Sequence, residues 1–183
     1  MTSTTSDRNQ WRFRSQNDKS MDSDQVLTEQ ISFPSGETVQ VQKRVFVFNR
    51  WTGAPVDTYG GKPVIDVGGE PLFAELALLR HFQKEGYDGV WVDTYRNRFR
   101  RSMSEESVKL PQPIRELYNQ IKAANGRRRG WWDVMAWKEG ELVFAESKWQ
   151  GQDHILPAQK TWLKAALSTG LRLNSFVICE WRF

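Results

Sequence analysis

From residue 71 onward the chain alternates between two hydrophobic patterns. Apolar residues three and four positions apart mark helices, whereas short runs rich in β-branched and aromatic residues mark strands. The expected helices span 72–84, 113–124 and 156–168, and the expected strands span 87–95, 131–137, 142–149 and 174–181. Such alternation is typical of an α/β domain in which helices cover a sheet.

Proline and glycine positions refine the helix ends. Pro71 and Pro157 are expected in the first turns of their helices, where a missing N–H group is tolerated, and Gly170 is expected just past the end of the last helix. Lys138 to Glu141 forms the turn between the two strands around it.

The first part of the chain has a different organisation. Residues 1–26 are polar and contain too few apolar side chains to offset the entropy of ordering, so we expect a disordered tail. Two strand-like runs, 28–33 and 38–48, flank the turn sequence Pro34 to Glu37 and predict a β-hairpin. We therefore expect a hairpin extension with a Gly- and Pro-containing connector over 27–70, followed by a core over 71–183.

Composition and charge narrow the function only slightly. The chain of 183 residues can form one sizeable core, and its net charge of +4, pI near 9.3 and nine Trp are compatible with a polyanionic partner such as DNA or RNA. A single cysteine, Cys179, can form no internal disulfide. With no signal peptide and no apolar run of about 20 residues, we expect a cytoplasmic protein without membrane contact.

The strand over 142–149 carries the first candidate chemistry. Side chains alternate between the faces of a strand, and both faces begin apolar here, so the strand should be covered on both sides. Glu146 and Lys148 then emerge together at its end. The preceding strand carries Asp133, which a hairpin would place beside Glu146. Two carboxylates and an ammonium group would share one pocket.

This combination fits metal-dependent hydrolysis. Two close carboxylates repel each other unless a cation lies between them, and Mg²⁺ or Mn²⁺ prefers such oxygen ligands. The ion can activate a bound water and neutralise charge on a phosphate, while Lys148 holds or polarises the attacking water. The alternative from the residues alone is a solvated cross-strand ion-pair cluster formed by Asp133, Glu146 and Lys148.

Two helices supply polar residues on apolar faces. Glu75 lies on the stripe of the first helix, three residues after Leu72, and Gln159 heads the stripe that continues through Trp162 and Leu163. A buried acid and a buried amide both need partners, which would be found at the same site. The alternative is that each helix is turned slightly, leaving these residues at an exposed border.

At these residues the sequence resembles the PD-(D/E)XK nuclease superfamily, and within it the VRR-NUC group. The likeness covers about 71–181, and its segments occur in the same order and at similar spacing as in that group. They are Gly130 to Val134, Phe144 to Lys148, Gly151 to Asp153, Gln159 to Leu163, and Gly170. One departure is Trp132, which stands where that group often has proline before its aspartate.

The resemblance implies a restriction-endonuclease-like mixed β-sheet flanked by helices, with a role for each polar residue. Asp133 and Glu146 would bind the metal, with the Ser147 carbonyl as a further ligand. Lys148 would orient the attacking water. Glu75 would act as an accessory acid and Gln159 as a supporting residue.

Arginine clusters are candidate contacts for the nucleic-acid backbone. Arg127, Arg128 and Arg129 precede the Asp133 strand, and a second group, interleaved with Tyr95 and Phe99, comprises Arg96, Arg98, Arg100 and Arg101. Such residues contact phosphates and the aromatic rings can stack on bases. Solvated loops are the alternative for both groups. The tryptophans at strand and helix spacing are expected to pack in the core or in the wall of a cleft.

Three functions remain open at this stage. The first is a metal-dependent endo- or exodeoxyribonuclease that cuts duplex, branched or otherwise irregular DNA, as a homodimer or within a larger repair or replication complex. The second is a nucleic-acid-binding module of the same fold with weak or no hydrolysis. The third is a protein-interaction domain, which predicts no salt-sensitive affinity for DNA.

Overall fold

A seven-stranded mixed sheet forms the centre of the protein. The computed structural model describes residues 27–58, 60–103 and 106–183, so the expected disordered tail lies outside the described residues. The order of strands across the sheet is β1-β2-β10-β9-β8-β6-β7. These strands are β1 (Thr28–Ser32), β2 (Thr38–Val47), β6 (Asp88–Asp93), β7 (Arg98–Arg100), β8 (Val134–Lys138), β9 (Glu141–Trp149) and β10 (Phe176–Arg182).

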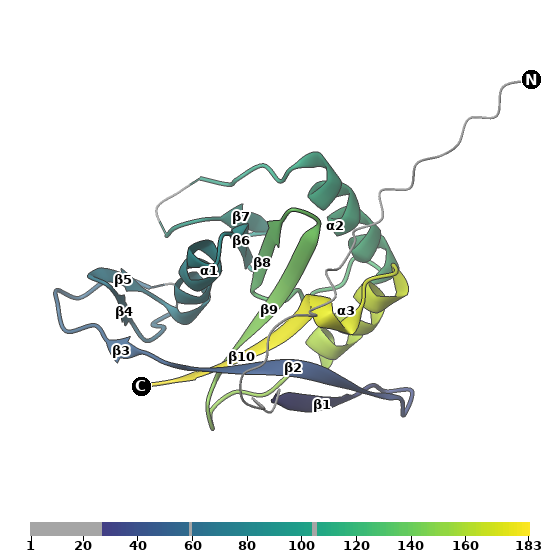
Figure 1. Ribbon diagram of the computed structural model, residues 1–183, viewed down its shortest axis with the longest axis horizontal. Helices are drawn as coiled ribbons and strands as arrows, with labels where there is room; N and C mark the ends of the chain where they lie inside the picture. Colours follow the sequence, from purple (N-terminus) through teal and green to yellow (C-terminus); the bar gives the residue numbers. More distant parts are fainter. Residues whose placement is uncertain (1–26, 59, 104–105) are drawn as a thin grey trace, which may run out of the picture.

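Helices cover both faces of this sheet. They are α1 (Ala74–Lys84), α2 (Gln112–Ala124), α3 (Pro157–Ser168) and the short 3-10 helix η1 (Leu173–Ser175). Helix α1 lies on one side of the sheet, and α2 and α3 lie on the other (Figure 1). Two separate hydrophobic cores result, one on each face. The expected mixed α/β class is confirmed, and each expected helix and strand is present with its ends shifted by a few residues at most.

Strand β9 contributes to both cores. Leu142 and Phe144 pack in the core beneath α2 and α3, whereas Val143 and Ala145 pack in the core beneath α1. The predicted alternation and two-sided cover are therefore confirmed. No helix in the described part of the chain is long and apolar enough to cross a membrane.

The N-terminal hairpin is built into the main sheet. β1 and β2 pair antiparallel, as the turn sequence predicts, and the second half of β2 pairs parallel with β10 from Gln42 to Val47. β10 pairs parallel with β9 on its other side. The hairpin thus extends the same sheet that carries Glu146 and Lys148.

A second, three-stranded sheet lies beside α1 in the segment expected to be a connector. Its strands are β3 (Asn49–Arg50), β4 (Ile65–Val67) and β5 (Glu70–Leu72). They are too short to show alternation in the sequence. Pro71 lies in β5, so its expected place in the first turn of α1 is wrong. Pairing of Ile65 with Leu72, both buried, keeps this segment extended up to Phe73.

Candidate metal-dependent catalytic site

Antiparallel pairing of β8 with β9 brings the first two candidate residues together. Val134 is opposite Ala145, so Asp133, one residue before β8, comes next to Glu146. The backbone N–H of Ser147 donates to Asp133 Oδ2 at 3.0 Å. The N–H of Val92 in β6 donates to the Asp133 carbonyl at 2.8 Å. Asp133 is therefore held from both neighbouring strands.

Lys148 and Gln159 converge on the carboxylate of Glu146, which is 1% exposed. Lys148 Nζ donates to Glu146 Oε1 at 2.8 Å and to Gln159 Oε1 at 3.2 Å. Gln159 Nε2 donates to the same Glu146 oxygen, and Gln159 Oε1 also accepts the N–H of Leu156 at 2.8 Å. The expected contact of Gln159 with the strand residues is present. Glu146 Oε2 is buried and has no hydrogen-bond partner among the described residues.

Gly130 explains how the segment before β8 reaches α3. Its φ is +112°, and a Cβ atom there would lie 2.2 Å from the Ala158 carbonyl oxygen in the first turn of α3. Only glycine fits such a conformation and such a close backbone approach. The contact places the first turn of α3, and hence Gln159, next to the segment that leads to Asp133.

Trp132, where the resemblance predicts proline, is a core residue. It is fully buried and lies against Trp162 and Phe176, with ring centroids 6.1 and 5.5 Å away. Its large ring anchors the segment by packing, and Asp133 keeps its place beside Glu146. Trp131 and Trp162 are likewise buried, as expected for packing residues.

Glu75 on α1 is 8% exposed, so its predicted burial is confirmed. Its partner is Lys62, whose Nζ forms an ion pair with Glu75 Oε1. The same ammonium group lies 4.8 Å from the centroid of the Phe73 ring. Lys62 belongs to the segment between β3 and β4, and the sequence analysis missed it. The only available indication was that a buried acid needs a cation or donor from elsewhere in the fold.

The two carboxyls of the candidate site, those of Asp133 and Glu146, both have raised pKa values. Burial, followed by the charge of Glu75, raises the pKa of Asp133 to about 6, while the Ser147 N–H, Lys148 and Lys62 act in the opposite direction. Burial and the charge of Asp133 raise the pKa of Glu146 well above its ordinary value. Both carboxyls therefore keep their protons to a higher pH than free carboxyls do, unless a cation compensates the charge of their ionised forms.

The metal-ligand set available here is small. In residues 27–58, 60–103 and 106–183, no group of three or more His, Cys, Asp and Glu side chains is close enough to hold a metal. Asp133 and Glu146 provide two carboxylates, and the Ser147 carbonyl is the predicted third oxygen. Mg²⁺ and Mn²⁺ accept such sets, because Mg²⁺ commonly keeps several waters and binds through one or two carboxylates.

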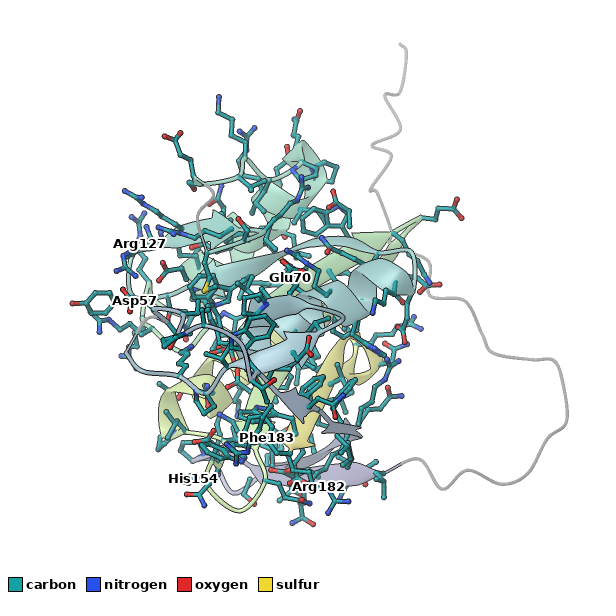
Figure 2. The ribbon with its side chains drawn as sticks, turned by 90° about the vertical axis from the view of Figure 1, so that its left-hand side faces the viewer. Asp57, Glu70, Arg127, His154, Arg182 and Phe183 are labelled. Carbon is teal, nitrogen blue, oxygen red and sulfur yellow. The ribbon has the colours of Figure 1, made fainter. Side chains whose placement is uncertain are left out.

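The predicted arginines separate into two groups in the structure. Arg98, Arg127, Arg128 and Arg129 are exposed and border one cavity. Arg127 lies at the outer edge of the molecule (Figure 2).

Arg100 and Arg101 are used within the fold instead. Arg100 is 7% exposed, and its Nε lies 3.6 Å from Asp93 Oδ2. Arg101 forms an ion pair with Asp88 at 2.8 Å and donates to the Gly89 carbonyl. These contacts join the segment of β7 to β6, so the structure does not place Arg100 and Arg101 with the exposed arginines.

Comparison with protein-family models, with curated proteins and with solved structures finds no match for this chain.

Proposed function

We propose that this protein is a divalent-metal-dependent nuclease that hydrolyses phosphodiester bonds of DNA. In this proposal it has a restriction-endonuclease-like fold and a PD-(D/E)XK site of the VRR-NUC type. The observation that carries the proposal is the convergence of Asp133, Glu146 and Lys148, with one oxygen of the buried Glu146 carboxylate left without a hydrogen-bond partner in the described part of the chain. A solvated ion-pair cluster would not leave such an oxygen inside the protein.

The residues fit a hard cation such as Mg²⁺ or Mn²⁺. Glu146 Oε2, the Asp133 carboxylate and the Ser147 carbonyl would hold it, and the raised proton affinity of the two acids would be relieved by its charge. When bound, the ion lowers the pKa of a water and stabilises charge on the phosphate.

Lys148 supplies the proton-handling and positioning group. Its ammonium donates to Glu146 Oε1 and Gln159 Oε1, two of the three hydrogen bonds that an ammonium group can form. The third hydrogen is available to the attacking water or to a phosphate oxygen. Gln159 fixes the direction of the ammonium because its own oxygen is also tied to the N–H of Leu156.

The decisive experiment is cleavage of labelled single-stranded, duplex, flap and four-way-junction DNA with Mg²⁺ or Mn²⁺ and with chelator. Glu146→Gln and Lys148→Met are the test variants, and Lys84→Met, which removes an exposed lysine at the end of α1, is the matched control. Cleavage should require the metal and fall by about 10²-fold or more in both test variants, as for loss of one electrostatic group at a reacting centre. Salt-sensitive binding without cleavage would favour the binding-module alternative.

A further inference from the structure

A cavity of about 310 Å³ lies beside the segment that carries Asp133. Its walls come from the end of β6, the β6–β7 turn, α2 and the loop after α2. Trp131, two residues before Asp133, lines it, and so does Val92, whose N–H binds the Asp133 carbonyl. The cavity and the catalytic site therefore share one stretch of backbone.

The lining of this cavity is cationic. It includes five basic side chains, those of Arg98, Lys122, Arg127, Arg128 and Arg129. Among the described residues, Asp93 is the only acid in the lining, and it already lies 3.6 Å from both Arg96 and Arg100. The described lining therefore holds five basic side chains against one acid, and this excess of positive charge suits a phosphate-bearing ligand.

Aromatic rings accompany these charges. Tyr118 and Trp131 stack on each other in the wall, with ring centroids 4.1 Å apart, and Phe99 lies edge-on to Tyr118. Tyr95 also lines the cavity and is 83% exposed, an unusual position for a large aromatic side chain. Its exposed ring, whose centroid lies 5.7 Å from the Arg96 guanidinium, is suited to stacking on a base.

The loop of residues 126–129 after α2, here called the arginine loop, is held in a defined shape. Asn125, which is 4% exposed, donates to the carbonyls of Arg128 and Arg129 at 2.9 and 3.4 Å. Arg127 adopts φ +59°, a conformation uncommon outside glycine, and its N–H binds the Lys122 carbonyl at 2.8 Å. Strain of this kind at exposed residues persists where surrounding contacts enforce it, often at ligand sites.

We propose that this cavity binds an unpaired nucleotide of a DNA strand, next to the catalytic site. Its size, near the lower end of the roughly 300–1,000 Å³ of small-molecule sites, suits one nucleotide. A base within a duplex is stacked and paired, so its face cannot reach Tyr95, whereas an unpaired base can stack there while Arg98 and Arg129 contact its phosphates. The inference rests on the proposed function for the class of ligand and adds which part of an irregular DNA is recognised.

The test measures binding without cleavage. A short labelled oligothymidylate and a duplex of the same length are titrated with the full chain in chelator, by fluorescence anisotropy at several salt concentrations. The variants are Arg98→Ala/Arg129→Ala, Tyr95→Ala and Tyr95→Phe, and Lys84→Ala is the control. The substituted side chains are exposed, so the variants should fold normally, which circular dichroism checks.

We expect tighter binding of the single strand than of the duplex. The double arginine variant should lower the salt dependence of log K by about 1.4, since each single-strand phosphate contact contributes about 0.7. Tyr95→Ala should weaken single-strand binding by roughly 5- to 100-fold, as for loss of one stacked base, while Tyr95→Phe and Lys84→Ala retain wild-type affinity.

Equal affinity for duplex and single strand, or wild-type affinity in the Arg98→Ala/Arg129→Ala and Tyr95→Ala variants, would overturn the inference. Failure of the nuclease proposal gives a different result, because single-strand binding that depends on Tyr95 would persist in a protein that cleaves nothing.

Discussion

The candidate catalytic site and the neighbouring cavity, which meet at the segment 130–133, differ in the charged groups that they hold. The acids of the site are largely withdrawn from water, with Glu146 1% exposed, whereas the arginines of the cavity are exposed. Burial makes an ionised carboxylate costly and raises its affinity for a compensating cation. Exposed arginines instead remain solvated until a phosphate displaces their counterions. One short segment thus separates a group of largely buried acids from a group of exposed arginines.

The largest expected effect, on the free energy of unfolding, distinguishes the buried Arg100 from the exposed Arg98 that borders the cavity. Arg100→Ala removes the buried one of the two guanidinium groups that lie 3.6 Å from the buried Asp93 carboxylate and leaves the exposed Arg96 beside it, which should lower the free energy of unfolding by about 3–5 kcal/mol. Arg98→Ala, on the exposed rim, should change it by less than about 0.5 kcal/mol. Urea denaturation measures both, and equal effects would contradict the division of the arginines.

The next prediction concerns a substitution at Gly130, in the segment 130–133 that the two regions share. Gly130→Ala would place a non-glycine residue at a positive φ and would bring its Cβ atom too close to the Ala158 carbonyl. Together these should lower the free energy of unfolding by about 2–4 kcal/mol. Gly86→Ala is the matched control, because its φ is +84° but no atom lies within 4 Å of the added Cβ, so it should cost only about 1–2 kcal/mol. A Gly130→Ala protein as stable as Gly86→Ala would show that α3 does not depend on this close contact.

A smaller effect is expected on the pH dependence of stability, through the buried carboxyl of Asp133. The folded protein holds the pKa of Asp133 near 6, above its ordinary value of 3.8, so its stabilising effect is present below about pH 4 and is lost as the pH rises through 6. In metal-free protein, Asp133→Asn removes the cost of a buried negative charge at pH 7.5. It should therefore raise the thermal midpoint at that pH by roughly 2–4 °C for each kcal/mol of this cost, and change it little at pH 4.

Differential scanning calorimetry at the two pH values checks this prediction. The same variant should lose its metal affinity, because one of the two carboxylate ligands is removed. A stability gain that is equal at pH 4 and pH 7.5 would argue against a raised pKa as the cause.

The smallest expected effect is on the pKa of Asp133 and concerns Lys62, which lies between β3 and β4 and forms an ion pair with Glu75 of α1. Its charge lowers the proton affinity of Asp133, so Lys62→Met should raise the pKa of Asp133 further above 6. Titration of the Asp133 carboxyl carbon by NMR in metal-free protein measures the change. Lys84→Met should leave this pKa unaltered, and an unaltered pKa in Lys62→Met would mean that Lys62 acts on Glu75 alone.

Most elements of the fold could be predicted because they are long enough to show a period. Helices α1, α2 and α3 and strands β8 and β9 repeat their apolar residues over several turns or alternations. The three-residue strands β4 and β5 do not, and there the pairing of Ile65 with Leu72 overrides the helical preference of Pro71. The joining of β2 to β10 was equally invisible, because their pairing links residues far apart in the chain.

For the candidate site, the sequence by itself determined which residues would meet. Alternation along β9 placed Glu146 and Lys148 on one face, a tight turn set Asp133 opposite Glu146, and helical spacing put Glu75 and Gln159 on packing faces. These are local rules of period and register, and they need no knowledge of distant segments.

Only the tertiary structure decided how these residues are partnered. It brought Lys62 to Glu75 and left Glu146 Oε2 without a hydrogen-bond partner among the residues that the structure describes. It also closed Arg98, Tyr95 and the arginine loop around one cavity. It also buried Arg100 against Asp93, although Arg98 two residues earlier in the same strand is exposed. Burial and charge compensation depend on which segments pack against each other, and that information is spread over the whole chain.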